Sequence, residues 1–439
     1  MNPKIWARLS ILLVIPFLFS AIDLVHRING SVSEDRFGYS IANLGDINND
    51  GYSDFAVGAP GVAQSKNYKG RVYIFLGGSR FSGKPDYILE GEKPGDRFGS
   101  AITSLGDIDN DGYIDYAISA DNNGEKGKNG GKVYIFKGIT QIKSYSLSDS
   151  SKITDIAEYT LLPKRGSEYF GCSIAGGKDI NEDNIPDLLI GSNYGGEEYT
   201  GIVYIYLGGN FDQPAKIIKG ESMGDLFGSN VKIIDDVTGD GISDFFVGAH
   251  YASVKGKAGA GKLYLYSGGT IISDKPTLTM NGEFENGWFG YAFEYIPNVY
   301  TDVNYIASSP RGGKEGNGDV VFLNIKGEIV HRLLPLSGVF RWGNSLTFIP
   351  DINNDEKNEV LIGAPTSTTS AGFQSGIANI FYGGSKFTGR SDVNINGMVP
   401  NGEFGSSSTY IPDFFSKGKG IIVIGAPSKG KAGYIEVYR

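Results

Sequence analysis

Residues 37–60 read FGYSIANLGDINNDGYSDFAVGAP, and the order of features in this stretch returns along the chain. It begins with an aromatic-Gly pair, passes through an acidic loop and ends in Gly-Ala-Pro. Successive aromatics of the pair are 61, 72, 57, 62, 53 and 62 residues apart, and such a period indicates a repeat architecture. The pairs are Phe37-Gly38, Phe98-Gly99, Phe170-Gly171, Phe227-Gly228, Phe289-Gly290, Trp342-Gly343 and Phe404-Gly405.

One repeat has the pattern of four short strands. We expect strands over residues 37–45, 54–59, 71–76 and 87–90, joined by Gly-rich turns and without a helical period. Four antiparallel strands per repeat correspond to one propeller blade, so the predicted fold is an all-β, seven-bladed β-propeller. The aromatic of each pair is expected to fill the gap between neighbouring blades, while its Gly lets two backbones approach.

The two ends of the chain predict how the ring closes. Residues 434–438 resemble a third strand with no fourth strand after them, and residues 22–29 resemble the missing fourth strand. Pairing them would remove an open sheet edge. We therefore expect one propeller over residues 22–439, with blades that start near residues 37, 98, 170, 227, 289, 342 and 404, and with residues 22–29 completing blade seven.

The first residues predict export. Lys4 and Arg8 precede the apolar stretch 9–19, and Ser20-Ala21 offers small residues for cleavage, so residues 1–21 resemble a signal peptide. The stretch is short for a spanning helix, which needs about 20 residues, although an uncleaved anchor stays an alternative. The expected location is secreted, periplasmic or at the cell surface. Cys172 is the single cysteine, which excludes an intrachain disulfide and favours a bacterial protein.

An acidic loop of nine residues recurs between the first and second strands of five repeats. Oxygen side chains at its positions 1, 3, 5 and 9, with a backbone carbonyl at position 7, suit a hard divalent cation, and Gly at position 6 suits the left-handed turn. The sequence therefore predicts up to five Ca²⁺ sites. The expected ligands are Asp46, Asn48, Asp50, Tyr52 and Asp54; Asp107, Asp109, Asp111, Tyr113 and Asp115; Asp179, Asn181, Asp183, Ile185 and Asp187; Asp236, Thr238, Asp240, Ile242 and Asp244; and Asp351, Asn353, Asp355, Lys357 and Glu359.

The repetition gives this motif its weight. A single copy is as consistent with a simple Asx-turn as with a metal site, whereas five copies at one point of a repeating unit favour metal. Repeats five and seven lack the spaced carboxylates at residues 297–302 and 412–417. The net charge of −9 is explained locally by these loops and gives no reason to expect nucleic acid as a partner.

Aromatic-Gly, an acidic DxNxDGxxD loop and Gly-Ala-Pro together resemble the FG-GAP repeat of the integrin α-chain head. Gly58-Ala59-Pro60, Gly363-Ala364-Pro365 and Gly425-Ala426-Pro427 match fully. The resemblance implies a propeller with Ca²⁺ loops on its lower face and partners on its upper face. The sequence also differs from that of an integrin α chain, because neither leg domains nor a transmembrane segment follow the repeats. We therefore expect a monomeric, isolated propeller with no transmembrane segment in the mature chain.

No catalytic constellation is recognisable. The three histidines, His26, His250 and His331, fall in different repeats, so we expect no enzyme activity. Loops of the upper face carry aromatics that can anchor a ligand or pack their own loops, namely Tyr68, Tyr194, Tyr199, Tyr251 and Phe373. The expected function is that of an exported, calcium-binding, integrin-like propeller that acts as a binding or adhesion module for a protein or glycan ligand. The alternative is a structural or accessory propeller in a cell-envelope complex.

Overall fold

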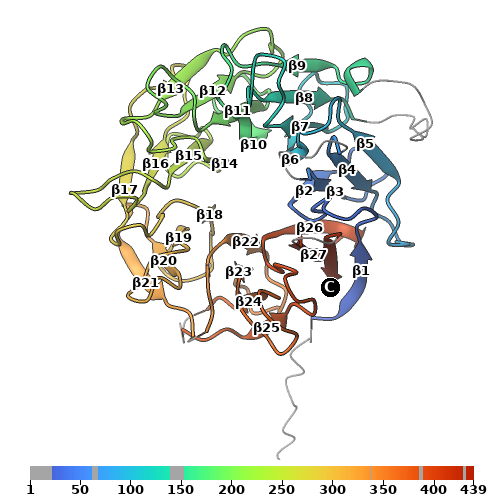
Figure 1. Cartoon of the computed structure of the whole chain (residues 1–439), viewed down its shortest axis with the longest axis vertical. Helices are drawn as coiled ribbons and strands as arrows, with labels where there is room; N and C mark the ends of the chain where they lie inside the picture. Colours follow the sequence, from blue (N-terminus) through green and yellow to red (C-terminus); the bar gives the residue numbers. More distant parts are fainter. Residues whose placement is uncertain (1–21, 62–67, 139–152, 337, 385–388, 429–431) are drawn as a thin grey trace, which may run out of the picture.

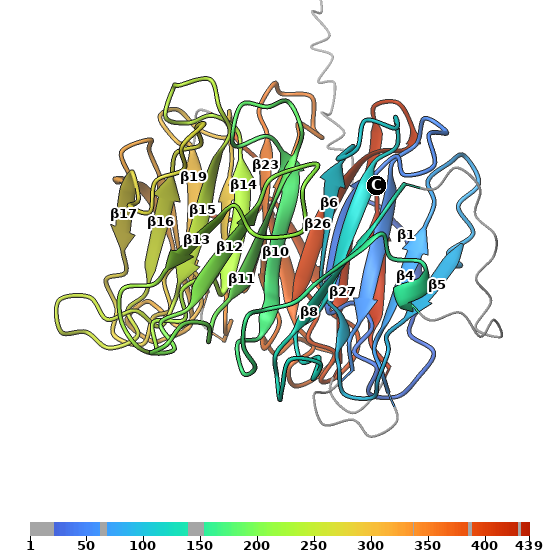
Figure 2. The same ribbon diagram turned by 90° about the horizontal axis from the view of Figure 1, so that it is seen from above.

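A computed structural model describes residues 22–61, 68–138, 153–336, 338–384, 389–428 and 432–439. In this part of the chain the strands form seven four-stranded antiparallel sheets, arranged as blades around a central axis (Figure 1). Seen at 90° to that view, the strands stand side by side and form the wall of a short cylinder (Figure 2). The predicted seven-bladed β-propeller is confirmed.

The first four blades each consist of consecutive strands, from the axis outward. Blade one is β2 (Ser40–Gly45), β3 (Asp54–Ala59), β4 (Arg71–Phe75) and β5 (Tyr87–Glu90). Blade two is β6 (Phe98–Gly106), β7 (Asp115–Ala120), β8 (Lys132–Phe136) and β9 (Tyr159–Leu161), with the 3-10 turn η1 (Ile153–Asp155) before β9. Blade three is β10 (Phe170–Lys178), β11 (Asp187–Ser192), β12 (Ile202–Tyr206) and β13 (Lys216–Lys219). Blade four is β14 (Asn230–Ile234), β15 (Asp244–Ala249), β16 (Lys262–Tyr266) and β17 (Leu278–Asn281).

The remaining blades follow the same order, except that the last one borrows a strand from the N-terminal side. Blade five is β18 (Phe293–Tyr295), β19 (Tyr305–Ser309), β20 (Asp319–Leu323) and β21 (Ile329–Leu333). Blade six is β22 (Ser345–Ile349), β23 (Glu359–Ala364), β24 (Ile377–Phe381) and β25 (Val393–Asn396). Blade seven is β26 (Ser407–Ser416), β27 (Lys419–Ala426), β28 (Tyr434–Tyr438) and β1 (Leu24–Asn29).

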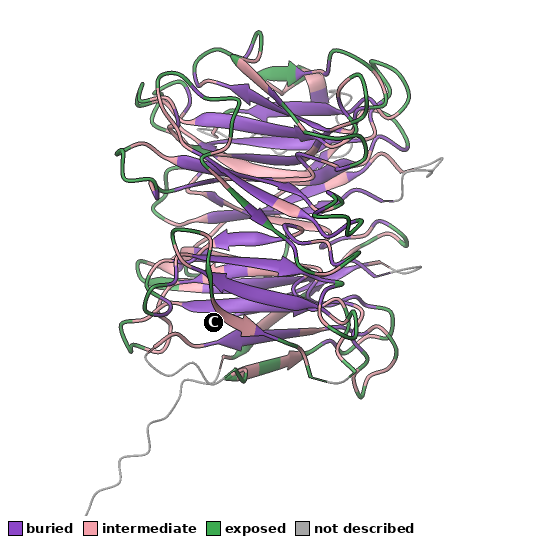
Figure 3. Cartoon of the chain, turned by 90° about the vertical axis from the view of Figure 1, so that its left-hand side faces the viewer, coloured by how far each residue is buried: buried purple, intermediate pink, exposed green. Residues whose placement is uncertain are grey.

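Hydrophobic cores lie between the blades. In the first six blades the second strand is buried over its whole length, because a neighbouring blade covers each of its faces. Burial accordingly concentrates in the strands, while the loops at both ends are exposed (Figure 3). Phe98 shows the predicted role of the aromatic: it joins the cluster shared by blades one and two and meets Tyr134 edge-on at 5.4 Å.

Two recurring glycines explain why the motifs at the two ends of the repeat occur together. A Cβ at Gly58, in Gly-Ala-Pro of blade one, would lie 2.1 Å from the carbonyl oxygen of Gly99, which follows the aromatic of blade two. Neighbouring blades therefore meet backbone to backbone at this point. In blades two and five the first glycine is replaced by Ser119 and Ser308, whose Cβ atoms face the Gly positions of the next blades.

The N-terminal strand closes the ring, as predicted. β1 pairs antiparallel with β28, with Asn29 opposite Tyr434 and Leu24 opposite Tyr438. Arg27 Nε also donates to Glu436 Oε1 at 2.8 Å, which ties the two strands through side chains. The expected signal peptide lies outside the described residues. Within those residues, no helix is long and apolar enough to cross a membrane.

Candidate functional site

The five acidic loops share one hydrogen-bonded geometry at the lower face, where the first strand of each blade turns into the second. The carboxylate at position 1 accepts the backbone N–H of position 6 in every loop, so the chain wraps around this side chain. The pairs are Asp46–Gly51 at 2.7 Å, Asp107–Gly112 at 2.9 Å, Asp179–Asn184 at 2.6 Å, Asp236–Gly241 at 2.7 Å and Asp351–Glu356 at 2.8 Å.

Positions 3 and 5 continue the same pattern. The carboxylate at position 5 accepts the backbone N–H of position 7 in the pairs Asp50–Tyr52, Asp111–Tyr113, Asp183–Ile185, Asp240–Ile242 and Asp355–Lys357. At position 3 the side-chain oxygens of Asn48, Asp109, Asn181 and Asn353 accept the N–H of position 5. Thr238 differs, because its hydroxyl donates to Asp244 at 3.3 Å.

Two residues of each loop adopt the left-handed conformation. Position 6 does so as expected, including the non-glycine residues Asn184 and Glu356, with φ of 66° and 67°. Position 4 is also left-handed, which the sequence reasoning missed. Its residues are Asn49, Asn110, Glu182, Gly239 and Asn354, and the frequent Asn at this position was the available indication, since Asn tolerates this conformation best after Gly.

The carboxylate at position 9 is buried and begins the second strand. Asp54 accepts the N–H of Ile47 at 3.0 Å and the N–H of Gly77 at 2.8 Å, so it ties its loop to the end of the third strand. Asp115, Asp187 and Asp244 make the equivalent pairs of bonds. In blade six, Glu359 Oε1 accepts from Ile352 at 3.3 Å, whereas its buried Oε2 has no hydrogen-bond partner.

These buried carboxylates are electrostatically strained. Loss of water raises the pKa of Asp54 and of Asp187 to about 7, and that of Glu359 to about 8. The loop carboxylates at positions 1 and 5 raise them further by repulsion. A divalent cation among such groups would offset the repulsion and the lost hydration, so the donor set fits a hard cation.

Blade two brings its carboxylates closest together. One oxygen each of Asp107, Asp109 and Asp115 lies within 4.8 Å of the others. Lys137 Nζ lies 2.7 Å from Asp109 Oδ2, which places an ammonium beside this cluster. The group at residues 297–302 of blade five, where the motif is lost, instead supports the loop of blade six: Asn298 Oδ1 accepts from Lys357 Nζ at 2.8 Å.

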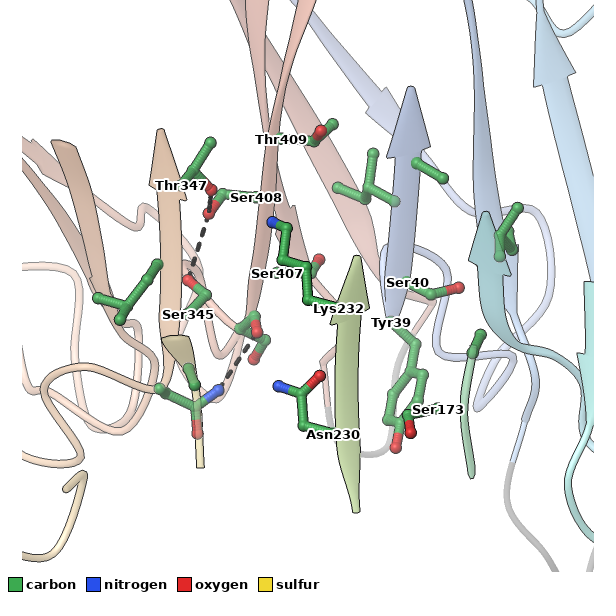
Figure 4. Close-up of a pocket in the computed structure, with 18 of the residues that line it drawn as sticks. Tyr39, Ser40, Ser173, Asn230, Lys232, Ser345, Thr347, Ser407, Ser408 and Thr409 are labelled. Atoms are coloured by element: carbon green, nitrogen blue, oxygen red, sulfur yellow. Dashed lines mark hydrogen bonds between the residues drawn. The ribbon is translucent and has the colours of Figure 1, made fainter. Parts of the chain in front are cut away.

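A central channel lies on the axis of the ring. Its cavity of about 950 Å³ is lined by the first strands of the blades. Small polar side chains face it, among them Ser40, Ser173, Asn230, Ser345 and Ser407 (Figure 4). Each of these stands three residues after an aromatic of the repeat, which is the sequence signal that identifies them. Deeper in the channel, Lys232 of blade four pairs with Glu294 of blade five.

Cys172 and His250 also line the channel. The Cys172 thiol contacts the Gly228 carbonyl at 3.5 Å, and burial raises its pKa to about 12, so it is not a reactive thiolate. Its side chain forms part of the channel wall. His250 Nδ1 lies 2.7 Å from Ser229 Oγ, and its ring meets Tyr251, Trp288 and Tyr291.

The upper-face aromatics divide into two groups. Tyr194, Tyr199, Tyr251 and Phe373 are exposed. Tyr68 instead packs over Gly61, and its hydroxyl is buried, so it belongs to its own loop. The exposed group is the one available to a ligand.

Sequence comparison places the repeats in a known class. The FG-GAP repeat matches residues 37–75 and 170–206. Human integrin alpha-IIb is 36% identical over 191 residues, which cover 42% of this chain and 17% of that protein. Drosophila melanogaster integrin alpha-PS2 is 32% identical over 218 residues, which cover 48% of this chain and 14% of that protein. The match thus spans less than a fifth of the length of these relatives.

The fold has a counterpart among solved structures. The crystal structure of BBS1N in complex with ARL6DN, soaked with lead, superposes with a TM-score of 0.53 and covers 93% of this chain and 96% of that one. Its sequence identity is 9%, so this likeness concerns the fold alone. The matched repeats, the similarity to integrin α chains and the ring of seven blades together show that this chain is an integrin-like FG-GAP β-propeller.

Proposed function

We propose that this chain is an exported, calcium-binding propeller that acts as a binding or adhesion module for a protein or glycan ligand on its upper face. The main support for calcium binding is that one loop geometry occurs five times. Each of these loops ends in a buried carboxylate at position 9. Similarity to integrin α chains supports a binding role rather than catalysis.

The residues at positions 1, 3, 5 and 9 would hold the cation through side chains, and those at position 7 through their carbonyls. Bound Ca²⁺ supplies positive charge that neutralises the crowded carboxylates and holds each loop to its blade. The same blades present the upper-face loops, so a rigid lower face would keep exposed aromatics such as Tyr199 and Phe373 in fixed positions.

A binding array of extracellular-matrix proteins and glycans tests the proposal. The purified chain is applied in millimolar Ca²⁺ and again with EDTA. We expect a specific ligand that is retained in Ca²⁺ and lost or weakened with EDTA. Absence of any specific ligand, combined with stable co-purification of envelope proteins from the source cells, would instead favour the accessory propeller.

A further inference from the structure

The residue before each aromatic-Gly pair is left-handed in all seven repeats, and none of the seven is a glycine. Their φ values run from 52° to 65°. A non-glycine residue in this region costs on the order of 1 kcal/mol, so the geometry is imposed by the surrounding fold. The seven residues are Arg36, Arg97, Tyr169, Leu226, Trp288, Arg341 and Glu403. Three of them, Arg36, Arg341 and Glu403, line the central cavity, and we call its upper end, where these residues precede the first strands, the channel mouth.

Arg341 has few partners for its charge. Its Nη2 donates to the Tyr291 hydroxyl at 3.3 Å, and its guanidinium lies over the rings of Tyr291 and Trp288, at 5.8 and 6.0 Å. Its Nε is buried without a hydrogen-bond partner. No carboxylate of the described residues lies within ion-pair distance of it. A guanidinium has five N–H donors, so most of the donors of Arg341 are unused.

Arg36 holds the same position before blade one, two blades along the ring from Arg341. Its guanidinium lies 4.6 Å from the centre of the Tyr39 ring. The Oε2 of Glu403 is 3.9 Å from its Nη2, which is too long for a direct hydrogen bond, and its Nε is buried without a partner. Arg97 shares the Tyr39 ring at 5.6 Å but is already paired with Asp121 at 2.9 Å.

The charges at the mouth therefore do not balance. The mouth holds two positive charges, on Arg36 and Arg341, and one negative charge, on Glu403. Deeper in the channel, Lys232 and Glu294 neutralise each other. Burial raises the pKa of the Tyr291 hydroxyl, whereas the nearby charges of Arg341 and Arg36 both lower it. One uncompensated positive charge, carried by guanidiniums that lie 4.6 to 6.0 Å from the centres of aromatic rings, suits a singly charged, planar anion.

Other side chains already cover the aromatic faces at the mouth, and this favours a peptide ligand over a glycan. Trp288 is covered by Arg311 at 4.5 Å and stacks with Tyr251 at 5.3 Å, and the guanidiniums of Arg36 and Arg97 lie over Tyr39. A glycan would need a free ring face on which to stack. Guanidiniums supported by rings are instead arranged to recognise charge.

We propose that the channel mouth binds a carboxylate of an acidic side chain on a partner protein, with Arg36 and Arg341 as the residues that contact it. This inference rests on the proposed binding function and names the chemistry of the ligand. The carboxylate would take the N–H donors that Arg36 and Arg341 leave unused, and Glu403 limits the mouth to a single added negative charge.

A fluorescent hexaglutamate peptide is the probe, with hexaglutamine as the uncharged control, and binding is measured by anisotropy at low salt. We expect hexaglutamate alone to bind, with an affinity that falls as salt is added. Arg36→Gln and Arg341→Gln should each weaken binding about tenfold, the loss of one charge-assisted contact. Arg80→Gln removes the same charge from an exposed loop of the lower face and should leave binding unchanged.

A further variant, Glu403→Gln, keeps the proposal testable if an arginine variant does not fold. Removal of this acid should tighten hexaglutamate binding. The proposal is overturned if hexaglutamate does not bind, if it binds equally to the arginine variants and to Arg80→Gln, or if Glu403→Gln does not tighten it. Binding of an oligogalacturonate instead of hexaglutamate would also overturn it. If a protein ligand found on the array binds Arg341→Gln as tightly as the wild-type protein, this inference is refuted and the proposed function stays intact.

Discussion

The carbonyl oxygen of Gly38, in the first blade, lies against Gly425 of the last blade so closely that a Cβ at residue 425 would fall 2.2 Å from it. The hydroxyl of Ser407 donates to the same carbonyl at 2.7 Å. Gly58 and Gly99 make the equivalent contact between blades one and two. The ring is thus closed by the contact that joins consecutive repeats, and no special interface is needed.

Gly425→Ala should destabilise the ring at its closure. The added methyl would overlap the Gly38 backbone, which cannot move without separating blades one and seven, so we expect a loss of about 2–3 kcal/mol. Urea denaturation measures the effect. Gly124→Ala is the control, because Gly124 has open space around its Cβ position and should tolerate the change. Equal stability of the two variants would contradict the role of close backbone approach.

Calcium should stabilise the fold through the five loops. Loops of this kind are expected to bind in the range of roughly 10⁻⁴ to 10⁻³ M, so millimolar Ca²⁺ adds about 0.4–1.4 kcal/mol per site, or several kcal/mol in total. Thermal unfolding with Ca²⁺ and with EDTA measures this. An unchanged melting temperature would show that the loops are held by their hydrogen bonds alone.

The loop of blade two should bind calcium most tightly and the loop of blade six least. Blade two provides four carboxylates, three of them with oxygens within 4.8 Å of one another, whereas blade six places Glu356 in a left-handed turn. Calorimetric titration of Asp111→Ala and Asp355→Ala checks the order. Loss of the tighter component in Asp355→Ala would mean that charge count and turn conformation do not govern affinity.

Lys137 should compete with a cation at the blade two loop. Its ammonium lies 2.7 Å from Asp109 Oδ2, so the site must release this contact before it accepts another positive charge there. Lys137→Met is expected to increase the affinity of that loop several-fold. Lys93→Met, which removes an exposed lysine elsewhere on the chain, serves as the matched control in the same titration. Unchanged affinity in Lys137→Met would show that the lysine moves aside freely.

His250 should make stability depend on pH. Burial and the nearby Arg341 lower its pKa from 6.5 to about 4, so the unfolded chain takes up a proton before the folded one does. The contribution of neutral His250 to the free energy of unfolding is complete above pH 6.5 and is lost as the pH falls towards 4. The loss amounts to about 2 kcal/mol at pH 5.

The His250 effect must be separated from that of buried carboxylates. Burial raises the pKa of Asp319 to about 6, so its effect on stability has the opposite sign over this pH range. The informative measurement is therefore the difference between the wild-type protein and His250→Gln in denaturation at pH 7 and pH 5. The variant should lose less stability on acidification. Identical losses would show that His250 is protonated without cost.

The repeat and its loops could be predicted from the sequence because they depend on contacts within about sixty residues. The alternating strands and the carboxylates of Asp46 to Asp54 act inside one blade, and local patterns report such contacts. The aromatic before Gly38 packs between blades, but its regular recurrence in the sequence still identifies it. Even the left-handed turn at Asn184 followed from its place in the loop. The closure by residues 22–29 was also predictable, since a missing strand at one end matched an extra strand at the other.

The channel and its mouth were decided by tertiary structure. Ser40 and Ser407 share one position in the repeat, three residues after its aromatic, but they are far apart in the sequence and line one cavity because the ring closes. Arg36, Arg341 and Glu403 look like unrelated residues until the ring places the start of every blade around one axis. Their charges matter together because electrostatic interactions depend on distance in space, and that distance exists once the seven blades have closed.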